Sequence, residues 1–463
     1  MTGRWAAPLR DGARSAAGRV RRITRRGTPA GRANRRQLVV TALIAAGVAA
    51  SAFLTGQATG EWQDMTRQET KRSAAAVEDI TFVYGAEAPQ AVRVALAEAR
   101  AGTLGLDAAL RGDDGEIERI EAASERQYVW QLRYAEKGRG TLLDGDAYRR
   151  PDGSYDLPRR LAATRAAHPD LVRLDPDDAL AAGDRKARWA ALCASAAVPL
   201  LACYFLTQLL ERRRNAGGGD GEREGGEGEG GRDGGTDEVE LIPPVPARRE
   251  PRPWPGLVTG LAFVLFTVLV APQLYFGNKE QRSQALAARA GTRLTAEIRA
   301  SGALDAFRQE SLRIVLNNDL KAHTREYVNL DTEDAELAVQ QRALAGADQA
   351  SRPQFERITT AMSRAPAAQD GVDPLTRELM GTTPADWKAG LERQGRALDA
   401  AEAASRRNNL MTGAILFAGL ALSISAVAMV RARAEAPGAA ALTVGAGALV
   451  AASVVTVVLA AIP

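Results

Sequence analysis

The fold class follows from the stretch Pro255–Phe276, which has the sequence PGLVTGLAFVLFTVLVAPQLYF. Its 22 residues include no Asp, Glu, Lys, Arg or His. At ~1.5 Å per residue, a helix of this length covers a hydrocarbon core of ~30 Å. A buried helix of a soluble protein is the alternative interpretation of a single run of this kind. We expect a transmembrane helix here.

Four further runs of similar length also lack charged residues, which makes a set of buried soluble helices a poor interpretation. Aromatic residues stand at several of their ends, as in the interfacial belt of membrane proteins. The sequence therefore predicts an all-α membrane protein with about five transmembrane helices. The predicted spans are 38–56, 189–210, 255–276, 410–430 and 439–463.

Arginine positions predict the orientation in the membrane. The tail 1–37 contains eleven arginines and one acid, and arginines also lie at both ends of the segment 211–254 and in the turn 431–438. By the positive-inside rule these three segments are cytoplasmic. We expect a multi-pass protein of the bacterial cytoplasmic (inner) membrane, with its N-terminus inside and its C-terminus outside. Some basic residues would then lie outside, at the ends of loops too long for the rule to weigh heavily: Arg185, Lys186, Arg188, Arg406 and Arg407.

The basic tail allows two further interpretations. Asn34–Val39 resembles a twin-arginine export signal, with Ala50-Ser51-Ala52 as a cleavage site, but the 19-residue apolar run and the long leader favour an uncleaved anchor. Nucleic acid is not an expected partner, because no aromatic residues alternate with the arginines of a tail that abuts a span. Anionic lipid, at ~1 kcal/mol per arginine near the surface, is the expected contact of Arg21, Arg22, Arg25, Arg26, Arg35 and Arg36.

The chain repeats one plan twice: a span, a long outer segment and a second span. The outer segments, 57–188 and 277–409, are rich in the helix-forming residues Ala, Arg, Glu and Leu. Helix starts at Asp175-Pro176 and Thr383-Pro384 should each begin a long helix that enters the following span. We expect two extracytoplasmic helical-bundle domains, which suggests a tandem duplication. Between the two halves, glycine alternates with charged residues, as in a disordered cytoplasmic linker over 211–254.

One part of the first outer segment is not expected to be helical. Pro151-Asp152-Gly153, between Tyr148 and Tyr155, predicts a β-hairpin turn. The neighbouring acids Asp144 and Asp146 allow a calcium loop, but an EF-hand needs an oxygen ligand where Tyr148 stands. We favour a solvated turn over a metal site.

No motif predicts catalysis, a metal or a cofactor. Gly226–Gly231 matches G-x-G-x-x-G, but carboxylates flank it and no strand precedes it. The chain has two histidines, His168 and His323, and neither has a catalytic partner motif. Its two cysteines, Cys193 and Cys203, both lie in one apolar run, which excludes zinc ribbons and disulfides in the outer segments. We predict no catalytic, cofactor-binding or metal-binding residues.

The spans suit helix packing better than active transport. Coupled carriers keep ionisable residues within the bilayer, and these runs contain none. Small residues spaced by four allow helices to approach closely. The expected packing residues are Gly256 and Gly260, Ala42 and Ala46, and Gly447 and Ala451.

Three functional hypotheses remain, in this order. The first is a non-enzymatic membrane protein whose outer domains bind, sense or scaffold within an envelope complex, with a membrane or envelope protein as partner. Its layout is similar to that of the sensor modules of chemoreceptors and sensor kinases, although no kinase or methylation segment follows. The second is an accessory subunit of a transport or export system. The third is an envelope-modifying enzyme that uses outer carboxylates.

Overall fold

The computed structural model of the chain describes residues 29–217, 254–331, 333–363, 372–433 and 437–462. Within these ranges the regular structure is helical, and the β-type pairing consists of one isolated antiparallel bridge between Arg149 and Tyr155. The predicted all-α fold is therefore confirmed for this part of the chain.

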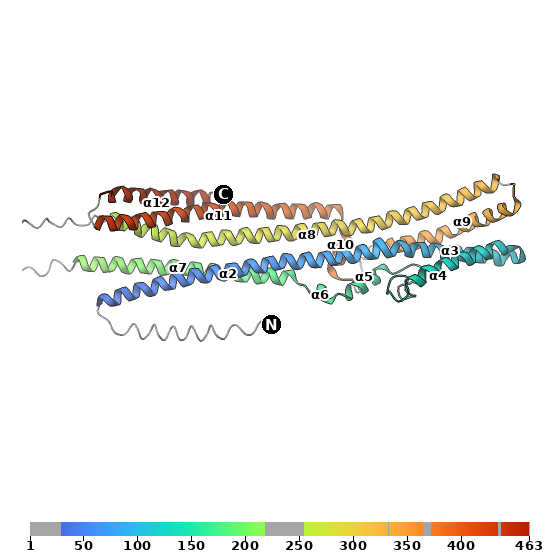
Figure 1. Cartoon of the computed structure of the whole chain (residues 1–463), viewed down its shortest axis with the longest axis horizontal. Helices are drawn as coiled ribbons and strands as arrows, with labels where there is room; N and C mark the ends of the chain where they lie inside the picture. Colours follow the sequence, from blue (N-terminus) through green and yellow to red (C-terminus); the bar gives the residue numbers. More distant parts are fainter. Residues whose placement is uncertain (1–28, 218–253, 332, 364–371, 434–436, 463) are drawn as a thin grey trace, which may run out of the picture. The chain divides into compact units, whose positions relative to one another are not determined.

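Figure 1 shows the helices in the order in which they follow one another along the chain. Two of them are not α-helical: η1 is a π-helix and η2 a 3₁₀-helix. In chain order the elements are α2 (Pro29–Ile80), η1 (Thr81–Glu87), α3 (Ala88–Arg111), η2 (Gly112–Gly115), α4 (Glu116–Ala135), α5 (Leu157–Ala166), α6 (Pro169–Val172), α7 (Pro176–Gly217), α8 (Trp254–Asp331), α9 (Ala335–Ser363), α10 (Pro374–Gly381), α11 (Pro384–Arg433) and α12 (Ala439–Ala461).

Among the described residues, three helices are long and apolar enough to cross a membrane, which suggests a membrane protein. They are Gly256–Asp331, Pro384–Ala432 and Ala439–Ala461, and they contain three of the five predicted spans. The other two predicted runs lie in α2 and α7, whose side chains are described only in part. The count of five spans therefore stays a prediction.

Both predicted helix starts are confirmed. α7 begins at Pro176, where the Asp175 carboxylate accepts hydrogen bonds from the backbone N–H groups of Asp177 (3.0 Å) and Asp178 (3.2 Å). α11 begins at Pro384, and the Asp386 carboxylate accepts from the backbone N–H of Thr383 at 2.8 Å. These bonds satisfy N–H groups that a helix end leaves free. Both helices then run on without interruption to Gly217 and Arg433, as predicted.

The predicted hairpin turn also forms, and a single bridge between Arg149 and Tyr155 is its only strand pairing among the described residues. Gly153 has a φ of +84°, a conformation that glycine adopts without strain, and the backbone N–H of Arg150 donates to the Ser154 carbonyl at 2.8 Å. The nearby acids serve turns. Asp144 accepts from the backbone N–H groups of Gly138 (3.1 Å) and Gly140 (2.7 Å), and these bonds hold the pKa of its carboxyl below its ordinary value.

The chain divides into two compact units. Helices α2, α7, α8 and α11 each contribute to both, so the division cuts across the helices rather than between them. Unit 1 comprises Met1–Glu61, Ala181–Arg282 and Ala400–Pro463, and unit 2 comprises Trp62–Leu180 and Ser283–Asp399.

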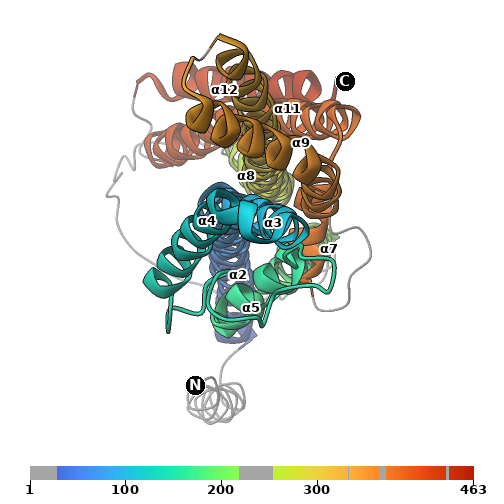
Figure 2. The ribbon, with the colours of Figure 1, turned by 90° about the vertical axis from the view of Figure 1, so that its right-hand side faces the viewer.

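In unit 2, the two outer segments share one hydrophobic core. The Tyr84 ring, from the first segment, meets Phe307 of the second edge-on, with ring centroids 5.9 Å apart. Helices α3, α4 and α9 lie side by side (Figures 1 and 2). Since helices far apart in sequence fill the same core, neither outer segment buries its apolar face alone. The larger core residues include Ile80, Val83, Tyr84, Leu142, Tyr155, Leu157, Leu161, Leu304, Phe307, Phe355, Ile358, Met362, Leu375 and Leu379.

Unit 2 also contains a buried charge cluster that joins four helices. The fully buried Asp348 carboxylate of α9 lies 2.6 Å from Nε of Arg100 on α3 and 2.5 Å from Nη1 of Arg325 on α8. Arg100 in turn pairs with Glu125 of α4 at 2.6 Å. Burial raises the pKa of Asp348, although both arginines oppose that shift. The cluster balances two positive side chains with two carboxylates, as buried charges require.

Unit 1 is held together mainly by small residues. Ala414 and Ala421 of α11 and Ala446 and Ser453 of α12 are all buried, and Ser453 Oγ donates to the Ala414 carbonyl at 2.7 Å. A set of polar contacts, the polar collar, ties the helices of unit 1 where the apolar runs end. Its pairs are Lys186–Glu61 (2.6 Å), Arg282–Asp184 (2.8 Å) and Asn408–Glu280 (3.1 Å).

Candidate functional site

Unit 2 contains a groove of about 900 Å³ between the α2–η1 stretch and α8, called here the α2–α8 groove. Its volume lies within the range of ~300–1,000 Å³ that is typical of ligand sites. Small side chains form much of its lining, so the two helices leave space rather than filling it. The lining residues are Thr70, Ser73, Ala74, Val77, Glu78, Thr81, Phe82, Gly85, Ala86, Gly291, Thr292, Thr295, Ala296 and Arg299.

The π-helix η1 forms part of one wall of this groove. Val83, Tyr84 and Glu87 of η1 point into the core, whereas Thr81, Phe82, Gly85 and Ala86 line the groove and are exposed. A π-turn adds a residue to a helical turn and weakens its hydrogen bonding, and such turns are found frequently at functional sites. The groove wall therefore contains one of the two departures from α-helical geometry among the described elements of unit 2.

A buried ion pair holds η1 from behind. The Glu87 carboxylate accepts two hydrogen bonds from the Arg160 guanidinium of α5, at 2.8 and 2.9 Å, and a third from the backbone N–H of Leu142 at 3.2 Å. A bidentate pair of this kind fixes orientation as well as distance. It keeps the inner face of the π-turn in place while the outer face stays open.

The groove offers hydrogen-bond acceptors and two free charges. The hydroxyls of Thr70, Thr292 and Thr295 donate to carbonyls of their own helices at 2.8–3.0 Å, so their lone pairs remain available. Glu78 on α2 and Arg299 on α8 are exposed, and within the described residues neither has an ion-pair or hydrogen-bond partner.

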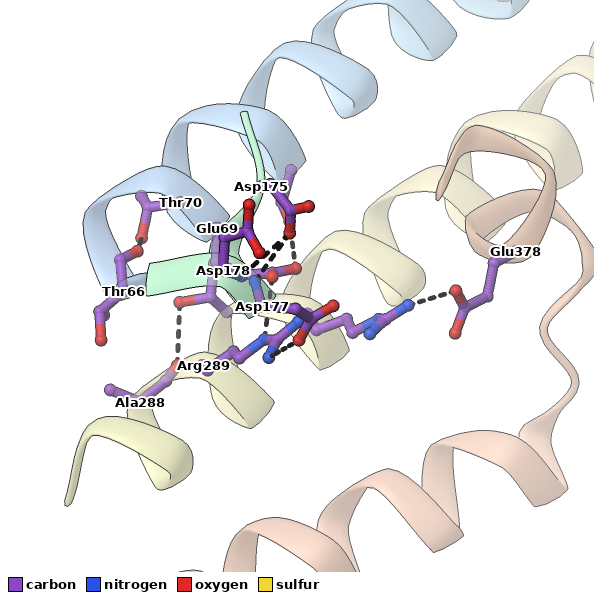
Figure 3. A network of polar contacts seen from close by, with 12 residues as sticks. Thr66, Glu69, Thr70, Asp175, Asp177, Asp178, Ala288, Arg289 and Glu378 are labelled. Atoms are coloured by element: carbon purple, nitrogen blue, oxygen red, sulfur yellow. Dashed lines mark hydrogen bonds and ion pairs between the residues drawn. The ribbon is translucent and has the colours of Figure 1, made fainter. Parts of the chain in front are cut away.

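Arg289, two residues before the groove residue Gly291, is part of the network of polar contacts in Figure 3. Its guanidinium donates to Glu69 of α2 at 3.0 Å and to Asp177, in the first turn of α7, at 2.7 Å. The hydrogen bond from Arg289 holds the pKa of the Asp177 carboxyl below its ordinary value. Ser73, which lines the groove, donates to the second Glu69 oxygen at 3.4 Å. Three helices are thereby fixed to one another beside the groove.

The residues predicted to pack helices together are not among the buried residues of the described structure, and their role in packing stays a prediction. Ala42, Ala46, Gly256 and Ala451 are exposed, Gly260 is half-buried, and a Cβ added to Gly447 would find no atom within 4 Å. Neighbouring small residues make contacts between the described helices. Examples are Gly47, whose added Cβ would lie 3.4 Å from the Cys193 carbonyl, and Ala446 and Ser453.

The residues predicted to contact anionic lipid fall largely outside the described part of the chain. Arg21, Arg22, Arg25 and Arg26 precede its first residue. Arg35 and Arg36 lie in α2, where the backbone alone is described. Their contacts with lipid stay a prediction.

Sequence reasoning missed the α2–α8 groove and the π-turn. Glycine and alanine at Gly85, Ala86 and Gly291 are the one local signal, and in so alanine-rich a chain it does not stand out. Within the described ranges, no group of three or more His, Cys, Asp or Glu side chains is placed to hold a metal ion.

Comparison of the chain with protein-family models, with curated proteins and with solved structures finds no match. Function must therefore be argued from the geometry of the groove and of the two units.

Proposed function

We propose that this chain is a non-enzymatic membrane protein whose outer helical unit binds a partner in the α2–α8 groove and acts in sensing or scaffolding within an envelope complex. The observation that carries the proposal is the π-turn η1 in the groove wall. The helix is irregular here although its inner face packs against the core. Natural proteins depart from regular geometry in this way mainly at functional sites, which supports a binding site.

The same helices connect the groove to the membrane. α8 contains both groove residues and the predicted span 255–276, and α2 contains groove residues and the predicted span 38–56. Because Arg289 fixes α2, α7 and α8 to one another, a partner that moves one of these helices would act on the others. This supports a sensing or scaffolding role.

The proposed topology keeps five spans, a cytoplasmic N-terminus and an outer C-terminus. Lys186 and Arg406 oppose this orientation, but each ends an outer segment of more than 100 residues, 57–188 and 277–409. The positive-inside rule counts basic residues over loops of up to ~60 residues, so the arginine-rich tail supports the orientation more strongly.

A tandem duplication is part of the proposal. Each half has a long helical stretch leading away from a span, a returning helix, a short helix and a proline-capped helix that leads into the next span. In the first half these are α2–α3, α4, α5 and α7, and in the second α8, α9, α10 and α11. We propose that the two outer segments act together as one binding unit.

Photocrosslinking in the membrane of living cells tests the proposed binding site. A photoreactive amino acid replaces Thr295, which is exposed in the groove, and in a matched control it replaces Lys321, which is exposed on the same helix outside the groove. We expect a discrete protein adduct from position 295 and none from position 321. Equal labelling at both positions, or none at 295, would contradict the proposal.

An accessory role beside a permease is the second candidate, and the exposed small residues of the spans favour it. Ala42 and Ala46 have no neighbour covering them in the described structure, as expected of a face that packs against another membrane protein. The photoreactive residue at Ala46 should then capture a polytopic protein, and a failure to capture one would remove this candidate.

A further inference from the structure

We propose that the partner in the α2–α8 groove is a second copy of this chain, bound so that Glu78 of each copy pairs with Arg299 of the other. This inference rests on the proposed function of the groove as a binding surface. Three properties of the groove residues indicate the occupant: their charge, their position along the helix axes and their exposure.

Glu78 on α2 and Arg299 on α8 lie at nearly the same level along the axes of these two parallel helices. α2 and α8 are held in register by Glu69–Arg289 at 3.0 Å. Further along, Arg93 of α3 pairs with Glu310 of α8 at 3.2 Å. Glu78 is nine residues beyond Glu69, and Arg299 is ten beyond Arg289. The difference of one residue corresponds to ~1.5 Å of helix rise.

Copies inserted in one membrane share the same orientation. A two-fold axis between two of them must therefore run along the membrane normal, and residues at equal height then face each other across it. A two-fold interface is isologous, so a contact from 78 to 299 occurs twice. Equal height and opposite charge are the two conditions that such a pair must meet, and Glu78 and Arg299 meet both.

Glu78 and Arg299 are the two charged residues in the lining of the α2–α8 groove. Arg93, Arg100, Arg133, Arg160, Arg289 and Arg293 all pair with carboxylates. Glu78 and Arg299, within the described residues, have no such partner although both line the same groove. Each would find the complementary charge on the other copy.

The shape of the groove suits the same occupant. Phe82 is 46% exposed at the groove, a large apolar side chain without cover. Around it lie Ala74, Gly85 and Ala86, where a second backbone or a bulky side chain can approach closely. In a symmetric pair, Phe82 of each copy would be covered by the groove of the other, and aromatic side chains are frequent anchors of interfaces.

Charge reversal in the full-length chain tests the proposal. The variants are Glu78→Arg and Arg299→Glu, each made with two different affinity tags and expressed in native membranes. Association is measured as the amount of one tag captured with the other after mild crosslinking. Each variant alone places like charges at both contacts, so its self-association should fall about ten-fold.

The two variants expressed together give the decisive result. In a mixed pair, the arginine introduced at position 78 of one copy faces the glutamate introduced at position 299 of the other. At the second contact the native Arg299 faces the native Glu78, so both contacts are complementary again. We expect the mixed pair to associate within about two-fold of wild type. Lys321→Glu, which changes charge equally on the same helix but outside the groove, should leave association unchanged.

Self-association of either single variant at the wild-type level would overturn the inference, and so would a mixed pair that stays apart. The crosslinker at Thr295 separates this failure from a failure of the proposed function. An adduct with a different protein would retain the groove as a binding site and overturn the second copy as its occupant. No adduct at all would overturn both.

Discussion

Unit 1 and unit 2 are built from the same helices but are stabilised by different side chains. The core of unit 2 contains large residues such as Tyr84, Phe307 and Phe355, all at most 1% exposed, and it buries ion pairs. In unit 1 the buried positions are mostly alanine and serine, and ion pairs cluster in the polar collar. This is the contrast expected if unit 1 lies in lipid and unit 2 in water. Water drives large apolar side chains together, whereas lipid offers no such gain and close backbone contact prevails.

Of the substitutions that test this contrast, Phe307→Ala should lower the free energy of unfolding most. Removing a fully buried aromatic ring leaves a cavity where the two outer segments meet, and the cost is ~4 kcal/mol. Chemical denaturation of the detergent-solubilised chain measures it. An effect below ~1 kcal/mol would mean that the shared core does not stabilise unit 2.

Asp348→Asn should cause the second-largest loss of free energy of unfolding. The substitution leaves Arg100 and Arg325 facing a neutral amide in a buried site, at a cost of ~3 kcal/mol. Glu402→Gln, which breaks an exposed pair with Arg406, is the matched control and should change stability little. Similar losses of stability for the two substitutions would contradict the claim that burial makes the Asp348 ion pairs more important than the exposed pair.

Ser453→Ala should cost much less. It removes one hydrogen bond between α12 and the Ala414 carbonyl, and such bonds in membrane proteins average ~0.6 kcal/mol. The measurement is the same denaturation curve. A loss as large as that of Phe307→Ala would show that unit 1 depends on polar contacts rather than on close packing.

Asp177→Asn should have the smallest effect, and it should depend on pH. The hydrogen bond from Arg289 lowers the pKa of Asp177 from its ordinary value of 3.8. A lowered folded-state pKa contributes stability above pH 3.8 that is lost as the pH falls through the folded value. The thermal midpoints of wild type and variant should therefore differ at neutral pH and converge on acidification. A difference independent of pH would contradict this role.

The sequence predicted local features well. The helix starts at Pro176 and Pro384 and the turn at Gly153 were predictable, because caps and turns depend on neighbouring residues. The absence of charge from 255–276 likewise predicted an apolar helix long enough to cross a membrane.

Features that join distant helices could not be predicted. The contact of Tyr84 with Phe307 and the pairing of Arg289 with Glu69 link residues more than 200 positions apart, and no local pattern encodes their register. The burial of Ala446 and Ser453 in α12 likewise depends on a neighbouring helix, and the four-residue spacing of Gly447 and Ala451 did not indicate it. The π-turn has no sequence signature of its own.

Splitting the chain tests most directly the claim that both outer segments form one unit. Residues 1–235 and 236–463 are expressed as separate chains in one cell, with a tag on the first alone. If the shared core holds, the halves should co-purify in equal amounts, and Phe307→Ala in the second half should abolish this while Ser453→Ala does not. Halves that purify separately without any substitution would contradict the account.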